Sequence, residues 1–428
     1  MKRFAGWGNV PAMAITSSMC IGGMMLFMPV LSLIFRDLGA TDLNISISAA
    51  AWTTAAALSQ YLGGQLSDRV GRVPVLVTAC FGGSAALAAA SFATSWIPFL
   101  FLYMTFQFNH AVQMPVFSST IGESVEPRRR GRAFSLVELC IAIAAASTPL
   151  IGARMMELTG TQQLLLLASG MWFGAGIIRY RLLRETRPTT TAGATFGFSE
   201  VIRGRLLSVT LVAVGCQVAL TLTKWGPFMA LHANDFMGLT RVQINTYYAV
   251  GAVCAVFISP LAGSLVERFG SYITLGMSVL VFGSSFVLWS VQTSIPMVIA
   301  SYVLIGISFQ FCMISLGAFR VAAIDDEVRG RALGALGTLA MLTAALSVPL
   351  IGYLETQLGP FTPFIAGLVV AVAVFARLLA MYRSGDEHRH DEITTVGPAE
   401  TLVGTPPVPA PGPRDTRLPL DGATPPKE

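Results

Sequence analysis

Three ionisable side chains lie well inside long apolar stretches of this chain: Glu138, His110 and Lys224. A charge costs several kcal/mol to place inside a bilayer, so each residue is a candidate for function. Glu138 can act as a proton carrier, but a structural ion pair with Arg132 or Arg320 is the alternative. His110 is the only one of the three that titrates near neutral pH without help. Its alternative is a hydrogen bond between helices.

Lys224 follows Gln217 and Thr221 at spacings i, i+4 and i+7, which places the three on one stripe of a helix. A stripe facing a cavity would let the ammonium hold an anionic group or compete with a proton. The alternative is that Lys224 extends to the outer membrane interface, because Trp225 and His232 follow it closely.

Further polar residues are candidates for lining a substrate cavity. They are Gln107, Asn109, His110 and Gln113 in one apolar stretch and Gln310 in another. Soft sulfur ligands that would suit a transition metal together with His110 are also present: Met19, Cys20, Met24, Met25 and Met28. Methionine in apolar helices usually fills space, so the sequence predicts no metal site.

The sequence contains no motif that indicates an enzyme. None of the three lysines belongs to a phosphate-binding G-x-x-x-x-G-K-[ST] loop, and there is no nucleophile motif or metal-ligand cluster. The six cysteines are scattered without a C-x-x-C pair, which argues against a disulfide framework and against zinc. We therefore expect neither an enzyme nor a cofactor.

The composition places these residues in a membrane protein. Hydrophobic residues make up 54% of the 428 residues and charged residues only 12%, about half the charged share of a soluble domain. With about 20 apolar residues per crossing, 12 spans fit between residues 10 and 382, the first over 10–35 and the seventh over 206–231. The net charge of +5 then reflects the two sides of a membrane rather than a nucleic-acid partner.

Lysine and arginine set the orientation. The predicted outer loops carry only Arg36, Arg154 and Arg241, whereas 18 Lys and Arg residues, Arg179 among them, fall in the predicted inner loops up to Arg331. Positive residues favour the cytoplasmic side. We expect both termini in the cytoplasm and the chain in the inner (cytoplasmic) membrane of a cell.

The chain repeats itself at an offset of about 199 residues. Arg130-Gly131-Arg132-Ala133 returns as Arg329-Gly330-Arg331-Ala332, and Pro149-Leu150-Ile151-Gly152 returns as Pro349-Leu350-Ile351-Gly352. The repeat divides the chain into an N-terminal six-helix bundle (1–183), a cytoplasmic connector (184–205), a C-terminal six-helix bundle (206–383) and a proline-rich tail (384–428). Repeats with an even number of spans keep the same topology. The tail has too few apolar residues to fold and is expected to be disordered.

The most informative repeat is a charged, glycine-rich hinge between two spans. Its first copy is Gly64-Gln65-Leu66-Ser67-Asp68-Arg69-Val70-Gly71-Arg72, and its second copy ends in Glu267-Arg268-Phe269-Gly270. We expect Gly64 to allow close backbone approach and Gly71 to make a tight turn. An acid at Asp68 is placed to meet the positive N-terminus of a helix.

The first hinge resembles the signature loop Gly-x-Leu-[Ser/Ala]-Asp-Arg-x-Gly-Arg of the major facilitator superfamily, and the resemblance covers about residues 10–382. It implies an all-α membrane protein of 12 helices in two pseudo-symmetric bundles, with alternating access to a site between them. It also implies that Asp68 meets helix 11, which begins at Arg329 and Arg331, so the two hinges form a cytoplasmic gating motif.

A weaker resemblance links the Pro149 and Gly152 segment to the Gly-Pro-x-x-Gly-Gly motif of 12-span proton-coupled exporters. It implies bends at Pro149 and Gly152 in helix 5 and at Pro349 and Gly352 in helix 11.

The sequence therefore predicts a monomeric secondary transporter in a lipid bilayer that exports a small amphipathic compound in exchange for protons. Uptake of a polar metabolite or of a metal species is the alternative within transport. A membrane scaffold or sensor that moves no substrate is the alternative outside it.

Overall fold

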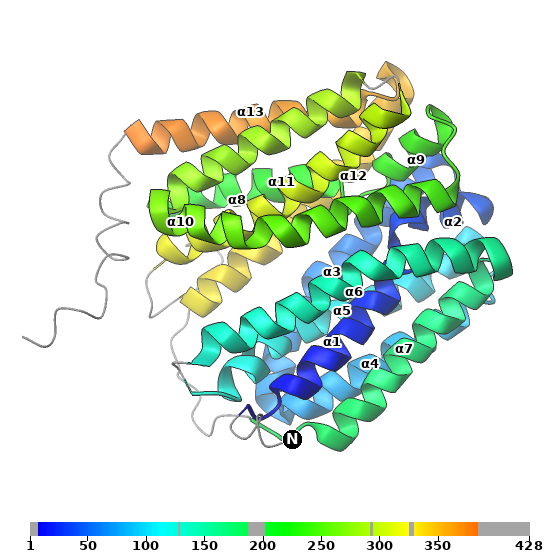
Figure 1. Cartoon of the computed structure of the whole chain (residues 1–428), viewed down its shortest axis with the longest axis vertical. Coiled ribbons are helices and arrows are strands. Elements are labelled where there is room, and N and C mark those ends of the chain that lie inside the picture. The colour runs from blue at the N-terminus through cyan, green and yellow to red at the C-terminus, as the bar shows by residue number, and fades with distance from the viewer. Residues whose placement is uncertain (1–6, 127–128, 187–201, 292–293, 325–328, 384–428) are drawn as a thin grey trace, which may run out of the picture.

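The protein is all-helical in the computed structural model, which describes residues 7–126, 129–186, 202–291, 294–324 and 329–383 (Figure 1). Most of the predicted connector and the whole predicted tail lie outside these residues. The helices of the first half are α1 (Val10–Met25), the 3-10 turn η2 (Met28–Val30), α2 (Leu31–Asp37), α3 (Asp42–Val70), α4 (Arg72–Ala90), α5 (Trp96–Glu123), α6 (Arg130–Thr159) and α7 (Thr161–Leu182).

The second half lies beside the first, above it in Figure 1, and has a corresponding order of helices. Its helices are α8 (Gly204–Leu222), α9 (Phe228–Asp235), α10 (Arg241–Val291), α11 (Ile295–Ala322), α12 (Arg329–Leu358) and α13 (Thr362–Arg383).

Twelve membrane crossings follow from these helices, as the sequence predicts. Eight segments of the described chain are long and apolar enough to cross by length and composition, with α1 to α2 counted as one. The 51-residue α10 turns back at Gly270 and therefore crosses twice. The remaining crossings are α3, α5 and the pair α8 and α9.

The first and seventh spans are broken, although the sequence predicts each as one continuous helix. The first breaks between Met25 and Leu31, around Pro29, and the seventh breaks between Leu222 and Phe228, around Gly226 and Pro227. Proline lacks the backbone donor that a continuing helix needs and disfavours helical backbone at the residue before it. The break in α8 and α9 is the counterpart of the break in α1 and α2, 199 residues later.

Both hinges turn on a glycine in left-handed backbone. Gly71 has φ 106° between α3 and α4, and Gly270 has φ 77° inside α10. The close approach assigned to Gly64 is made instead by its neighbour Gly63, because a Cβ on Gly63 would lie 2.2 Å from the Val112 carbonyl oxygen. A Cβ on Gly64 would have no atom within 4 Å. We call the end of the molecule that carries Gly71 and Gly270 the hinge end, and the opposite end the distal end.

The two halves meet along two helix pairs, α3 with α12 and α6 with α10. In the first pair a Cβ on Gly352 would lie 2.3 Å from Ser46 Oγ, and Gln60 Nε2 donates to Met341 Sδ at 3.4 Å. From Ser46 to Gln60 the contact on α12 moves back from Gly352 to Met341, so α3 and α12 run antiparallel. At the distal end α2 lies against α9 (Figure 1).

Candidate functional site

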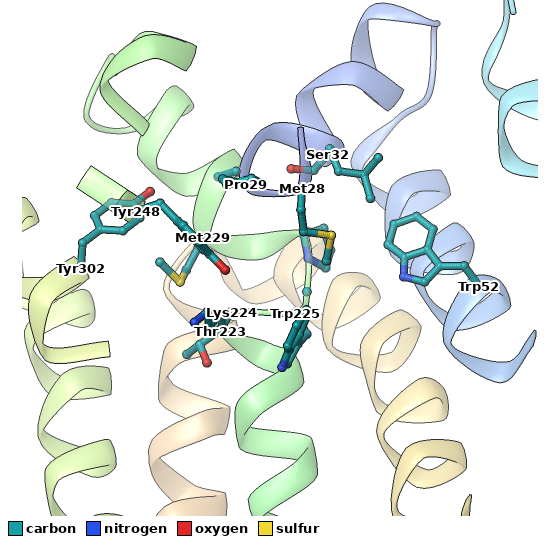
Figure 2. A pocket seen from close by; sticks show the side chains of 14 residues that line it. Met28, Pro29, Ser32, Trp52, Thr223, Lys224, Trp225, Met229, Tyr248 and Tyr302 are labelled. Atoms are coloured by element: carbon teal, nitrogen blue, oxygen red, sulfur yellow. The ribbon is translucent and has the colours of Figure 1, made fainter. Parts of the chain in front are cut away.

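A pocket lies between the two halves, at the level of the two helix breaks. Figure 2 shows Lys224 and Trp225 projecting from the α8 and α9 break, with Tyr248 and Tyr302 on one side and Trp52 on the other. The first half contributes Met28, Pro29, Leu31, Ser32 and Trp52, and the second half contributes Thr223, Lys224, Trp225, Gly226, Pro227, Met229, Ala230, Tyr248 and Tyr302.

The breaks explain why these residues line a cavity. Irregular backbone is tolerated at membrane depth only where it is buried in protein or faces a cavity. Gly226 can sit in the break because its missing side chain leaves room for the Thr221 carbonyl oxygen, which would lie 2.0 Å from a Cβ there. On the other half, Gly152 of α6 leaves similar room for the carbonyl oxygen of Leu26 at the α1 break. Each break is therefore supported by a glycine that permits close packing.

Among the residues that the structure describes, Lys224 is the only charged one that lines the pocket. Its Nζ lies 4.0 Å from the centroid of the Phe309 ring and 5.4 Å from that of Tyr248. Cation–π contacts of this kind stabilise an ammonium in part. No ion pair joins Lys224 to an acid in the part of the chain that the structure describes. The ammonium is thus held by aromatic faces, with no counter-charge among the described residues.

Other polar atoms point into the same space. The hydroxyl of Tyr302 is buried without a hydrogen-bond partner among the described residues, and the side chain as a whole is 3% exposed. Thr223, by contrast, donates to the carbonyl oxygens of Ala219 and Leu220 at 3.2 Å each. The pocket therefore offers one unused hydroxyl and one unneutralised cation.

The predicted stripe on the seventh span is interrupted by the break. α8 ends at Leu222, so Lys224 leaves the helix and enters the pocket, whereas Thr221 is buried and donates to the carbonyl oxygen of Gln217 at 2.9 Å. Gln217, Thr221 and Gln310 are not among the residues that line the pocket.

The predicted polar residues of α5 point in different directions. Asn109 lies against Gly82 of α4, where a Cβ would come within 2.5 Å of its Oδ1. Gln113 is buried and accepts a hydrogen bond from Arg179. His110 packs against Trp172, with ring centroids 5.9 Å apart, and the Oε1 of Gln107 is buried with no hydrogen-bond partner in the described chain.

Arg179 is the centre of a buried network that the sequence does not predict. It was expected in an inner loop, but it lies on α7 and is only 2% exposed. Its guanidinium donates to Thr16 Oγ1 at 3.1 Å, to Cys80 Sγ at 3.2 Å, to the Leu76 carbonyl oxygen at 3.3 Å and to Gln113 Oε1. These acceptors come from α1, α4 and α5, so one side chain ties four helices together.

A signal for this burial is present in the sequence of α7. Trp172, Ala175, Gly176 and Arg179 follow one another at helical spacings and all lie on the buried face of the helix. Cys80 of the same network also lies near Cys20, with the two Sγ atoms 3.8 Å apart.

Glu138 lies on α6 and is exposed. Thr148 and Gly152 on an adjoining face contact α1, since their neighbours there are Gly22 and Leu26. Pro149, eleven residues farther along α6 and so on nearly the same side of the helix as Glu138, is buried. No ion pair joins Glu138 to Arg132 or Arg320 within the described residues.

The first hinge is held together by arginine. Arg72 donates to Ser67 Oγ at 2.6 Å, to Asp68 Oδ1 at 2.7 Å and to Glu123 Oε1 at 3.3 Å. Glu185, which the sequence analysis missed, accepts from the backbone amide of Arg72 at 2.8 Å and caps the start of α4. A carboxylate at a helix N-terminus is favourable. Asp68 therefore pairs with Arg72, a residue of its own half.

The structure shows fewer contacts for the other predicted hinge residues. The guanidinium of Arg268 lies 5.3 Å from the centroid of the Phe269 ring, and Glu267 is exposed beside it. Arg329 and Arg331 lie in the first turn of α12, but their side chains are outside the described part of the structure.

The distal end carries ion pairs between the halves. Arg36 of α2 donates to both carboxylate oxygens of Asp235 of α9, at 2.5 and 2.8 Å, and also to Asp42 Oδ1 at 2.6 Å. Arg241 of α10 donates to Asp37 of α2. We call these residues the distal ion pairs.

Known proteins share this architecture. The sequence profile of the Major Facilitator Superfamily matches residues 13–234 and again residues 213–415. The multidrug resistance protein MdtL of Klebsiella pneumoniae is 24% identical over 57% of this chain, and the match spans 63% of that relative's length. A chloramphenicol resistance protein of Pseudomonas aeruginosa is 22% identical over 74% of this chain and 80% of its own.

Among solved structures, that of the human organic anion transporter MFSD10 superposes with a TM-score of 0.68, covering 86% of this chain and 98% of its own. At 15% identity this likeness shows the fold alone.

Proposed function

The chain belongs to the major facilitator superfamily of secondary transporters, and we propose that it exports a small amphipathic compound in exchange for protons. The observation that carries this proposal is the pocket between the halves, walled by tryptophan, tyrosine and methionine side chains. Apolar walls with a few polar groups suit an amphipathic ligand. The distant relatives named for multidrug and chloramphenicol resistance support export as the direction.

The distal ion pairs support alternating access as the mechanism. They join α2 to α9 and α10 at one end of the pocket, so in this conformation that end is closed. Opening it requires Arg36 to part from Asp235 and Arg241 from Asp37. We assign the distal end to the outside and the hinge end to the cytoplasm of an inner membrane, following the distribution of lysine and arginine.

The hinge acts as a latch when the hinge end closes. Extending the antiparallel register of α3 and α12 beyond the contacts described above, we infer that Asp68 faces Ala332, one turn inside the helix that begins at Arg329. The positive end of α12 then attracts the carboxylate. Asp68 is half exposed here and bonded to Arg72, so closing exchanges a contact within one half for a contact between halves.

We assign proton coupling to Glu138 in preference to His110. Glu138 is exposed on α6, a helix that meets the second half, and we infer that water reaches it when the hinge end is open. His110 instead packs between the rings of Phe106 and Trp172. A carrier must meet water in one state and be shielded in the other.

The test is flux in inside-out vesicles with a panel of amphipathic compounds, with and without a proton gradient. Export predicts accumulation that depends on the gradient and is lost in Glu138→Gln, while Ser135→Ala, on the same helix, retains it. Uptake predicts the opposite dependence on pH. If no compound moves while Asp68 and Glu138 variants alter binding of another protein, the chain is a scaffold or sensor and the transport proposal fails.

A further inference from the structure

Within the described part of the chain, no acid lines either of the two adjoining pockets that the ammonium of Lys224 faces. The first is the pocket between the halves, and the second extends from it along Gly251 and Gly306, where α10 and α11 cross. Both pockets are lined by Lys224, Met229, Tyr248 and Tyr302, and the described residues that line them include no aspartate or glutamate. An ammonium buried without a partner is costly, so a ligand with negative charge would be stabilised here.

Lys224 does not extend to the membrane interface in this structure. The eight residues of α9 separate the break from the distal end, which corresponds to about 12 Å of helix at 1.5 Å per residue. The Nζ atom is instead held 4.0 Å from the centroid of the Phe309 ring, inside the second half. The alternative of an interfacial lysine is therefore not the arrangement that the structure has.

Two neighbouring features favour the same charge. α9 begins at Phe228, directly after the break, and its N-cap residue, Pro227, makes no side-chain capping hydrogen bond. The amides of an uncapped N-terminus favour an anion. The Tyr302 hydroxyl is buried and unpartnered in the described structure, so it can donate to an anionic oxygen.

The other walls of the pocket are apolar and aromatic. Trp52 and Met28 face it from the first half, and Trp225 and Met229 face it from the second (Figure 2). The ring of Trp225 lies against that of Phe309, with centroids 5.8 Å apart. These surfaces suit a hydrocarbon or aromatic body rather than a polar one.

We propose that the pocket selects an organic anion, with a carboxylate or similar acidic group at Lys224 and Tyr302 and an apolar, often aromatic, body between Trp52 and Trp225. This inference rests on the proposed transport function and narrows its substrate class. It assigns Lys224 as the residue that determines the sign of the substrate's charge.

The test compares three probes of one shape and different charge: 1-naphthylacetate, 1-naphthylacetamide and 1-naphthylmethylamine. Binding to the purified full-length protein is measured by equilibrium dialysis. We expect the carboxylate to bind at least tenfold more tightly than the amide and the amine to bind most weakly. Equal binding of carboxylate and amide, or tighter binding of the amine, would overturn the proposal without the need for any variant.

Variants then locate the effect. Lys224→Gln should remove the preference for the carboxylate, and Lys224→Arg should keep it. Tyr302→Phe should weaken carboxylate binding several-fold, whereas Tyr61→Phe, on an exposed face of α3, should not. A preference that survives in Lys224→Gln would place the anion elsewhere and overturn the assignment.

Counterflow of the same probes in proteoliposomes separates this inference from the proposed function. Binding of the carboxylate without counterflow of any probe would keep the anion site and remove the transport function. Counterflow of the amine alone would keep transport and remove the anion site.

Discussion

Neutralising the acids of the distal ion pairs should open the distal end of the transporter. The variants are Asp235→Asn, which removes the charge facing Arg36, and Asp37→Asn, which removes the charge facing Arg241. Both substitutions keep the shape of the side chain, so steric effects are small. Each breaks a contact between halves that exists only while the distal end is closed.

The size of the effect follows from exposure and geometry. The four side chains are 29–47% exposed, so solvent screens each pair, and pairs of this kind contribute about 0.2–1 kcal/mol. The bidentate ion pair between Arg36 and Asp235 should contribute a free energy at the upper end of that range. Losing both pairs should cost the closed state about 1–2 kcal/mol, which shifts the ratio of open to closed protein by about 5–30-fold.

Double electron–electron resonance, which measures the distance between two spin labels, can detect this shift. Leu158 at the distal end of α6 and Leu358 at the distal end of α12 are 66% and 74% exposed and belong to different halves. Labels on cysteines at these positions, in a background without the six native cysteines, should show a larger fraction of long distances in each single variant. The fraction should be largest in the double variant.

The matched control is Glu157→Gln, which breaks an ion pair with Arg154 inside α6 at the same end of the molecule. It should leave the distances unchanged because both partners belong to one half. A double variant with the native distance distribution, or a control variant that shifts as far as the double variant, would refute the gating role of the distal ion pairs.

Three further predictions concern the hinge and the core. Asp68→Asn should reduce transport severalfold at normal expression, measured as vesicle flux, and full flux would remove the latch from the mechanism. Gly63→Ala should lower the unfolding temperature in detergent, because its Cβ would meet a carbonyl oxygen, while Gly64→Ala should leave it unchanged. Arg179→Gln should destabilise the first half by about 2–4 kcal/mol, because several buried acceptors lose their donor; native-like thermal unfolding of the variant would contradict the structural role.

The number of crossings and the repeat could be predicted from the sequence because hydropathy and glycine-rich turns are local signals. The span count depends on about 20 apolar residues per crossing, and Gly71 and Gly270 mark equivalent turns. The helix breaks were missed although Pro29 and Pro227 were visible, since many membrane helices retain proline without breaking. Whether a proline kinks or interrupts a helix depends on what packs beside it.

Contacts between distant helices could not be predicted in the same way. Arg179 was placed in a loop because it stands near the end of an apolar stretch, yet acceptors on three other helices bury it. Glu185 was similarly missed, because the start of α4 that it caps lies more than 100 residues earlier in the chain. Such residues are identified only when the bundle is assembled.

The repeat explains how the distal ion pairs arise. Arg36 and Asp235 are separated by 199 residues, which is the offset of the hinge repeat, and so are Asp42 and Arg241. Equivalent positions of two similar halves face each other across the axis that relates them. Identical charges there would repel, so the opposite charges now present are evidence that the halves have diverged where they touch.

Divergence at the two helix breaks leads to a last prediction. At the repeat offset, the counterpart of Lys224 is Met25, so only one wall of the pocket is charged. Met25 lies close to the same aromatic residues, since its Sδ is 3.9 Å from the hydroxyl of Tyr248, whose ring lies 5.4 Å from Lys224 Nζ. Moving the charge across, in Lys224→Met with Met25→Lys, should therefore restore part of the carboxylate preference that Lys224→Met alone loses. Equilibrium dialysis with 1-naphthylacetate measures it, and identical binding by the single and double variants would show that selection depends on the position of Lys224 and not only on the charge of the shared pocket.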